Sequence, residues 1–583
     1  MSKEKKDRQS VLNNGLSRKD FLKAGGLALA GTSLAGLNDY IGPALQPAAV
    51  SSDFESWDNE ADFIIVGHGG AGAAAAITAT LEDLGSFIVL EAAPESGEGG
   101  NTRVSGQIIL IPDDVESAIT YQSALNGPHA VDPDLQRDWA TYLVENMEWF
   151  DDLDIVVLEA GAYSPEFPEL PSAEHNHTYC VDGIHGKNSL WNALMEKRDE
   201  IGDYEVHYDT RAVELVRNPM TNEALGVIAL KGANGFAEGP APAGGERVSY
   251  KAKKGVILAM GGFENDLKMI RTYLGLSQSR YPIGTPYNRG DGFRMVAPFG
   301  PELWHMNNGV GLMLGVRAEG LDSPVSVSGS YGYSMLPLKS YIFLGPDGKR
   351  FMYEDTVYNA RHGKKVTAGV YFDVPAPLGA WIIMDEMMFN NVPIASYGEQ
   401  GTGWATVQRS FIAEDNQGFL NKGVIIKADT IEELANKTGM PLGGLTETFE
   451  KYDQYVANQF DPEFHRGQSV YDEFAGMGGD SSTQVEGVLR EVIKPFDLQP
   501  LSPPYYATPL IGGFVNTQGG PKRNGNCQIL QAIDGQPIPR LYGTGEFGAI
   551  YSYMYNGGGN VSEALATGRV AIRHASTLEA WDE

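Results

Sequence analysis

Apolar runs of two lengths alternate along the chain between about residue 60 and residue 290. Runs of strand length, at 62–66 and 87–90, flank an alanine-rich stretch of helical length at 71–79. A further apolar run at 256–260 has the pattern of a buried strand. Strands that alternate with helices are typical of a doubly wound sheet with helices on both faces. The pattern therefore predicts an α/β fold for this part of the chain.

The texture of the chain changes after this region. Between about 295 and 490 aromatic residues and hairpin-like turns are frequent, and an amphipathic helix is predicted near Leu445–Phe460. We interpret 295–490 as an inserted α+β cap domain, between the two parts of a cofactor-binding domain at 57–294 and 491–583, with 1–56 as a separate N-terminal segment and linker. Pockets commonly form at domain junctions, so we expect the active site between cap and cofactor.

A glycine turn joins the first predicted strand to the alanine-rich helix. Gly67, Gly69 and Gly72 occupy the three glycine positions of a dinucleotide-binding turn, and Glu91 ends the second strand. In such a turn the glycines permit a tight bend, close approach of a pyrophosphate and close packing of helix on strand. The helix start, which includes Ala71, offers N–H groups to the phosphates, and the acid can accept both ribose hydroxyls. We therefore predict a dinucleotide site here.

Two further segments indicate which dinucleotide is bound. The loop at 99–106 is polar and small, as required where backbone must lie against a flavin ring. The C-terminal part supplies a strand followed by a glycine-rich helix start, whose N–H groups could meet the electron-rich pyrimidine side of a flavin. A nicotinamide enzyme needs no such second element. We predict FAD as the cofactor, with contacts from Asn101, Thr102, Ser105, Gly106, Glu546, Asn560 and Val561.

These segments resemble the FAD-binding blocks of the fumarate reductase/succinate dehydrogenase flavoprotein superfamily. The resemblance extends from about residue 60 onward and implies a Rossmann-type FAD-binding domain with an inserted cap. Further matching blocks are the buried strand that ends at Gly261, the turn at 288–292, and the segment 209–213, which in the family contacts the adenine half. The resemblance implies FAD contacts from Val213, Ala259, Gly261 and Asp291.

Composition limits the other classes of function. The formal net charge is −31, from 44 basic and 75 acidic residues, which argues against nucleic acid as a partner. Cys180 and Cys527 are the two cysteines, too few for an iron–sulfur cluster or a CxxCH haem; they could pair, but free thiols are favoured. His175 and His177 lack a further close ligand, so we interpret them as loop residues and predict no metal site.

The N-terminal segment has a pattern of its own. The polar stretch Ser17–Lys23 precedes a weakly apolar, small-residue run at Ala24–Gly36. It resembles a twin-arginine export signal, with Lys19 in place of the second arginine, and implies a periplasmic or cell-surface location. The alternative is a disordered tail on a cytoplasmic protein. The apolar run is too short to span a bilayer stably, so we expect no stable membrane insertion.

The superfamily resemblance also concerns the substrate. In fumarate reductases an arginine after the block at Gly348–Glu354 donates the proton, and a histidine and a second arginine hold a substrate carboxylate. Those three positions fall on Tyr358, Val515 and Asn556 in this chain. A dicarboxylate needs guanidinium partners to offset its desolvation, so fumarate and succinate are poor candidates.

The same positions resemble those of 3-ketosteroid dehydrogenases in the superfamily. That resemblance implies Tyr358 as the proton carrier, the Tyr555 hydroxyl and Gly559 N–H as donors to a substrate carbonyl, and Tyr121 as a further catalytic tyrosine. Two donors at an enone oxygen stabilise the charge that develops there, and a phenol can move the proton at the α carbon. We predict an FAD-dependent oxidoreductase that acts on a CH–CH or C=C bond beside the carbonyl of a bulky apolar enone, with hydride passing through flavin N5.

Two alternatives remain open. The first is a reductase of a small unsaturated acid, in which Arg289 or Arg361 replaces the missing cations. The second is a binding-only flavoprotein or electron carrier, against which the tyrosine set argues. The proposed residues would serve either direction of electron flow. An exported reductase would need a separate haem or quinol-linked donor, because the chain has no redox relay of its own.

Overall fold

The computed structural model describes the larger part of the chain, and all described elements lie within one compact unit, Ala48–Glu583. The described residues are 49–50, 56–127, 129–160, 165–167, 170–184, 186–202, 204–233, 244–275, 280–310, 313–316, 325–326, 340–352, 354, 364–367, 370–373, 379–391, 404, 415–464, 498–554 and 556–581. The segment that resembles an export signal therefore lies outside the described residues.

A nine-stranded sheet forms the centre of the described fold. Its strand order is β1-β8-β9-β10-β2-β3-β7, and β25 pairs with β10 and with β24. The strands are β1 (Ala49–Val50), β2 (Asn59–Val66), β3 (Phe87–Leu90), β7 (Val206–His207), β8 (Thr210–Arg217), β9 (Ala224–Lys231), β10 (Glu246–Leu258), β24 (Gln528–Leu530) and β25 (Pro537–Gly543). Strands β3, β2, β10 and β25 form the parallel core, in which Ile64 pairs with Ile88 and Val256, and Val256 pairs with Leu541.

Both faces of this parallel core are buried, which explains the unbroken apolar runs in the sequence. Along β2, Ile64 belongs to one hydrophobic cluster, and its neighbours Phe63 and Ile65 belong to a second cluster. Successive strand residues point to opposite faces, so a run that is apolar at every position fits a sheet covered on both sides. The predicted α/β class with a parallel core sheet is confirmed.

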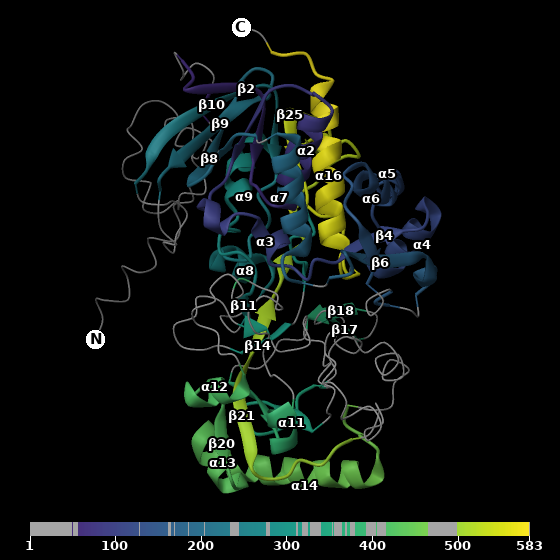
Figure 1. The fold of residues 1–583 in the computed structure, drawn as a ribbon, viewed down its shortest axis with the longest axis vertical. Coiled ribbons are helices and arrows are strands. Elements are labelled where there is room, and N and C mark those ends of the chain that lie inside the picture. The colour runs from purple at the N-terminus through teal and green to yellow at the C-terminus, as the bar shows by residue number, and fades with distance from the viewer. Residues whose placement is uncertain are drawn as a thin grey trace, which may run out of the picture. The chain divides into compact units, whose positions relative to one another are not determined.

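Two helices lie side by side against the core sheet, α2 (Gly70–Leu81) and α16 (Gly559–Ser576), as Figure 1 shows. Their approach is very close, because a Cβ on Gly568 of α16 would lie 2.1 Å from the carbonyl oxygen of Ala71. The run of small residues in α2 permits this packing. As a result, the N-terminal ends of α2 and α16 both reach the same cavity.

A second sheet has seven strands, in the order β15-β14-β21-β19-β16, with β11 and β20 also paired to β21. Its strands are β11 (Arg280–Pro282), β14 (Met313–Val316), β15 (Val325–Ser326), β16 (Tyr341–Leu344), β19 (Ala380–Met384), β20 (Ile426–Ala428) and β21 (Tyr505–Phe514). The amphipathic pattern predicted near Leu445–Phe460 corresponds to α14 (Leu442–Asn458). The return segment thus passes through this sheet before it enters the central one, and the domain boundaries stay predictions.

The other described strands form small sheets, and the other helices connect the strands. These strands are β4 (Ile109–Pro112), β5 (Val157–Glu159), β6 (Asn176–Val181), β12 (Leu303–Trp304), β13 (Gly309–Val310), β17 (Lys364–Thr367), β18 (Val370–Asp373), β22 (Asn516–Thr517) and β23 (Gly520–Pro521). The helices are α3 (Gly100–Arg103), α4 (Val115–Asn126), α5 (Pro133–Val144), α6 (Asn146–Asp152), α7 (Ser189–Ile201), α8 (Leu267–Tyr273), α9 (Asp291–Val296), α11 (Glu386–Asn391), α12 (Asn416–Asn421) and α13 (Ile431–Thr438). Among the described helices, none is both long and apolar enough to cross a membrane.

Candidate active site and cofactor cavity

One large cavity lies at the carboxyl ends of the central parallel strands. It encloses about 1570 Å³ of empty space, including space open to solvent. Most of the predicted FAD contacts line it: Gly67, Gly69, Ala71, Glu91, Asn101, Thr102, Ser105, Gly106, Ala259, Gly261, Asp291, Glu546, Asn560 and Val561. The structure thus brings together segments that are far apart in the sequence.

The first glycine loop shows why each glycine is present. A Cβ on Gly67 (φ +101°) would lie 2.3 Å from the Ala259 carbonyl oxygen, and a Cβ on Gly72 would lie 1.9 Å from the Gly67 carbonyl oxygen. These two glycines serve the protein's own packing, and Gly72 does not line the cavity. In contrast, a Cβ on Gly69 would have no protein atom within 3.7 Å. The missing side chain of Gly69 therefore leaves room for a ligand.

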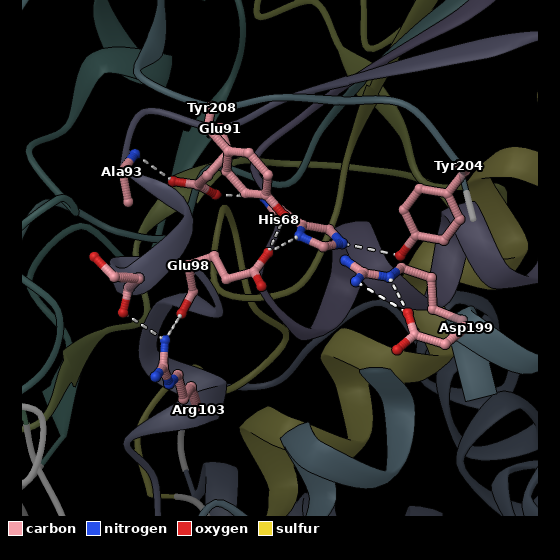
Figure 2. Close-up of polar contacts among 10 residues, drawn as sticks. His68, Glu91, Ala93, Glu98, Arg103, Asp199, Tyr204 and Tyr208 are labelled. Carbon is pink, nitrogen blue, oxygen red and sulfur yellow. Dashed lines mark hydrogen bonds and ion pairs between the residues drawn. The ribbon is translucent and has the colours of Figure 1, made fainter. Parts of the chain in front are cut away.

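Glu91 is held in place beside this loop by two main-chain donors (Figure 2). The N–H of His68 donates to one carboxyl oxygen of Glu91 at 2.7 Å, and the N–H of Ala93 donates to the other at 2.7 Å. Burial raises the pKa of Glu91, while both of these hydrogen bonds favour the carboxylate. The carboxyl group is thus fixed in orientation at the cavity wall, as a ribose acceptor must be.

Beneath Glu91 lies a buried polar network that the sequence did not reveal. The His68 ring is fully buried, with Nδ1 2.7 Å from Glu98 Oε2 and Nε2 2.9 Å from the Tyr204 hydroxyl. The Tyr208 hydroxyl donates to the same Glu98 oxygen at 2.7 Å. Burial opposes ionisation of Glu98, but the hydrogen bonds from His68 and Tyr208 outweigh it and lower the pKa. The network supports the His68 main chain, which in turn holds Glu91.

The second helix start also faces the cavity. The N-cap residues of α2 and α16 are Gly69 and Gly558, which have no side chain to cap the helix, although the Gly70 N–H at the start of α2 donates to Thr102 Oγ1 at 3.1 Å. The Asn560 side chain donates to Asn516 Oδ1 at 3.2 Å, but its own Oδ1 is buried and has no partner in the described part of the chain. A ligand would supply the partners that these groups lack. Two helix N-termini, one at each glycine loop, fit the pyrophosphate and the flavin of FAD.

The adenine side differs slightly from what the resemblance implied. Thr210, Arg211 and Ala212 line the cavity, whereas Val213 packs against an apolar cluster elsewhere on β8. Arg211 forms an ion pair with Asp291 at 2.5 Å, so the predicted contact Asp291 also neutralises a cavity-lining cation. Neighbouring residues on one strand face different surroundings, so similarity to a sequence block of the family does not by itself show which of them contacts the ligand.

Of the predicted catalytic residues, Tyr121 and Gly559 lie within the described part of the chain. Tyr358 and Tyr555 lie outside the described residues, as does Arg361. Tyr121 is 1% exposed and does not line the cavity; its hydroxyl donates to Asn556 Oδ1 at 2.7 Å. Gly559 does not line the cavity either, and its N–H donates to the Asn556 carbonyl at 3.0 Å. The catalytic roles of these residues stay predictions.

The loop before α16 is held by side chains from distant segments. Asn556 is fully buried, and its Oδ1 accepts from the Tyr121 hydroxyl and, at 2.9 Å, from the Glu166 N–H. The Glu166 carboxyl accepts in turn from the Gly557 N–H at 2.5 Å. No pattern in the sequence points to Glu166, because it lies almost 400 positions before the loop that it supports.

The two cysteines and the histidine pair that the sequence analysis considered for a disulfide and a metal site also lie within the described residues. Cys180 and Cys527 are both buried free thiols, so they form no disulfide. His175 and His177 contact Asp113, and His177 also contacts Glu159, at partly exposed positions. In the described part of the chain no group of three or more His, Cys, Asp or Glu side chains could hold a metal ion.

Fold and cavity together define a flavoprotein, and comparison with known proteins agrees. Residues 62–562 match the family described as FAD binding domain, and the chain belongs to this family. FAD is its cofactor, as predicted, and the protein is an FAD-dependent oxidoreductase that acts on CH–CH groups. The predicted membership of the fumarate reductase/succinate dehydrogenase flavoprotein superfamily is confirmed.

Individual relatives come from two branches. The chain is 25% identical to a 3-oxosteroid 1-dehydrogenase of Mycobacterium tuberculosis, over 88% of this chain and 98% of the relative. It is 26% identical to the acrylate reductase flavoprotein subunit of Shewanella woodyi, over 96% and 98%. The crystal structure of 3-ketosteroid Δ1-dehydrogenase from Sterolibacterium denitrificans, with 1,4-androstadiene-3,17-dione, has a TM-score of 0.67 at 21% identity and covers 89% of this chain and 99% of that chain. This likeness supports the fold.

Proposed function

We propose that the protein interconverts a CH–CH and a C=C bond beside the carbonyl of a bulky, apolar enone such as a 3-ketosteroid. The observation that carries the proposal is the nature of Val515 and Asn556, which stand where fumarate reductases hold a substrate carboxylate. Val515 is an apolar lining residue of the cavity, and Asn556 is fully buried with its amide bonded to the protein. Neither offers a cation to a carboxylate, and Val515 favours an apolar substrate.

The arginines that line the cavity do not replace these cations. Arg211 is paired with Asp291. Arg289 lies close enough to Arg211 for burial and the charge of Arg211 to lower its pKa, while Asp291 acts in the opposite direction. Arg211 and Arg289 thus belong to one charge cluster with Asp291, and Arg211 comes from β8, the strand expected on the adenine side. The described arginines of the cavity are thus engaged with other charges, which supports a substrate that is not a carboxylate.

Within this proposal the chain's own residues polarise the substrate and move one proton. The bound FAD supplies the hydride acceptor or donor at flavin N5. The Tyr555 hydroxyl and a main-chain N–H of the glycine loop donate to the carbonyl oxygen, where negative charge develops. Because the Gly559 N–H already donates to Asn556, the substrate carbonyl would share or replace that bond. Tyr358 carries the proton at the α carbon.

A second candidate is reduction of a small unsaturated acid. It is favoured by the acrylate reductase flavoprotein subunit, which aligns with almost the whole chain. Arg289 or Arg361 would then bind the carboxylate. If the N-terminal segment directs export, such a reductase would take electrons from a separate haem or quinol-linked donor, since nicotinamide donors are not available outside the cytoplasm.

A panel of oxidants applied to the reduced enzyme separates the two candidates. We expect 4-en-3-one and 1-en-3-one steroids, or similar apolar enones, to reoxidise the dithionite-reduced flavin, and fumarate and acrylate to leave it reduced. Absorbance of the flavin follows the reaction directly. Rapid reoxidation by a small acid at micromolar concentration, without a response to enones, would favour the second candidate.

The role of Tyr358 has its own test. Tyr358→Phe should leave FAD and ligand binding nearly intact and slow turnover by about 10²–10⁴, because it removes a general acid or base. Exchange of solvent deuterium into the substrate α carbon should fall in parallel. Full activity and full exchange in this variant would place the proton carrier elsewhere.

A further inference from the structure

Two glutamates face one another in the wall of the cofactor cavity. Glu546, which follows β25, lines the cavity, whereas Glu264, which follows β10, lies behind it and is 1% exposed. A Cβ on Gly262 would lie 2.3 Å from Glu546 Oε1 and 2.8 Å from Glu264 Oε2. Together with Thr517 Oγ1, which would lie 1.9 Å from the same Cβ, the two carboxyl groups therefore occupy the space that a side chain at position 262 would need, and they face one common point.

Asn101 connects the two carboxyl groups through a single amide nitrogen. Its Oδ1 accepts from the Thr285 N–H at 2.9 Å, so its NH₂ group must point the other way. Asn101 Nδ2 then donates to Glu264 Oε1 at 2.7 Å and to Glu546 Oε2 at 3.0 Å. These two hydrogen bonds from one amide hold the carboxyl groups of Glu264 and Glu546 next to each other.

The remaining donors leave one oxygen without a partner. Asn288 Nδ2 donates to Glu264 Oε1 at 2.7 Å, and the Thr517 N–H donates to Glu546 Oε1 at 3.1 Å. Glu264 Oε2 is buried and has no donor in the described part of the chain. Like Glu546 Oε1, it faces the place where a Cβ on Gly262 would stand. A proton between these two oxygens would satisfy both.

Among the described residues, the side chains bonded to the pair carry no positive charge that would offset two carboxylates. Three neutral side chains face the pair: Asn101 from α3, Asn288 from the turn before α9 and Thr517 from β22. Among the described residues no cation forms an ion pair with either acid. Burial raises the pKa of Glu264; burial and the charge of Glu264 raise the pKa of Glu546 well above its usual range. Two like charges this close in a buried site do not both ionise readily.

We propose that Glu264 and Glu546 share one proton, so that the pair presents a single negative charge, rather than two, to the bound FAD. Glu264 acts here as a positioning residue, because it does not line the cavity itself and acts through side chains that do, those of Glu546, Asn101 and Asn288. The shared proton keeps a second buried charge away from a cofactor that already carries a pyrophosphate and gains electrons in turnover. The inference concerns the cofactor and holds for either candidate substrate.

The pH dependence of FAD affinity tests the proposal. The wild-type protein should bind FAD well at neutral pH and lose affinity by about tenfold or more as alkaline pH removes the shared proton and adds a second charge. E264Q and E546Q can carry only one charge at this place, so their affinity should stay nearly constant over the same range. A Gln amide can donate to the remaining carboxylate, so both variants should fold. E302Q, in a partly exposed ion pair with Lys522, is the matched control and should follow the wild type.

Infrared spectroscopy of the apoprotein and holoprotein detects the proton itself. At neutral pH the difference between wild type and either glutamine variant should show the carbonyl band of a protonated carboxyl group, shifted in D₂O and lost at the pH where FAD affinity falls. Difference spectra are needed because burial also raises the pKa of Glu563 to about 7. Absence of that band, or an identical pH profile of FAD affinity in the wild type and both variants, would overturn the proposal.

Discussion

The two glycine loops that border the FAD cavity are held in shape by different means. The loop before α2 is fixed by glycines that pack against main chain, since a side chain on Gly67 or Gly72 would collide with a carbonyl oxygen. The loop before α16 is fixed by side chains from distant segments, through Tyr121 and Glu166. The first loop thus takes its shape mainly from small residues of its own, which pack closely against main chain, whereas the second is held by hydrogen bonds from side chains far away in the chain.

This difference matches what each loop must do. A pyrophosphate is common to all FAD enzymes, and a rigid local turn can bind it in any fold that places a helix behind it. The second loop borders both the flavin and the proposed substrate region. Support from outside the loop allows its position to be adjusted by residues that do not touch the ligand.

The largest expected effect is at the first loop. Gly69→Asp should give a folded protein without FAD, because its Cβ would meet no protein atom closer than 3.7 Å, while its carboxylate would place bulk and charge where the pyrophosphate is predicted to bind. Flavin release followed by chromatography measures FAD content, and circular dichroism measures folding. Gly72→Ala is the contrasting variant. Its Cβ would lie 1.9 Å from the Gly67 carbonyl oxygen, so this variant should lose both FAD and the folded state. Full FAD content in Gly69→Asp would refute this assignment of the cavity.

Sequence alone could predict the first loop because its cause is local. Three glycines, one strand and one acid lie within thirty residues, and each has a direct physical reason. The same holds for the apolar strands of the core, which are buried on both faces. The prediction of Val213 shows the limit of this reasoning, since a block match does not fix which neighbouring residues of a strand line the cavity.

The next largest effect is expected at the second loop, as a loss of turnover rate. Tyr555→Phe should slow turnover by about 10²–10³ and weaken substrate binding, because one donor to the carbonyl oxygen is lost while the loop N–H donors remain. Steady-state kinetics with an accepted enone measures both quantities. FAD content serves as the control and should not change. Unchanged turnover would mean that the carbonyl is bound by other groups.

Tyr121 tests whether the second loop depends on distant support. Tyr121→Phe removes the donor to Asn556 Oδ1 and the acceptor of the Phe167 N–H bond, so the protein should lose about 1–3 kcal/mol of stability. Chemical denaturation measures the loss. A general acid would behave differently, with a large fall in turnover at nearly unchanged stability. That second outcome would restore the catalytic role that the family resemblance implies for Tyr121.

Sequence reasoning could not recover this support, because its cause is tertiary. Glu166 binds partners far away in the chain, as His68 of the first loop also does, and no pattern of spacing marks either residue. The dyad of Glu264 and Glu546 has the same character. Only Glu546 lies in a segment that matches the family blocks, and its partner becomes visible when β10 and β25 pair side by side.

The smallest expected effect is at Glu166. Glu166→Gln keeps an oxygen that can accept from the Gly557 N–H but loses the charge that strengthens this bond, so we expect a loss of about 1 kcal/mol or less. Glu166→Ala removes the acceptor entirely, leaves the partly buried Gly557 N–H without this partner, and should cost more, about 1–3 kcal/mol. Denaturation curves of the two variants, compared with that of Tyr121→Phe, measure how much of the loop depends on each contact. Equal stability of Glu166→Ala and the wild type would show that Glu166 does not support the loop, and the contrast between the two glycine loops would then rest on Tyr121 alone.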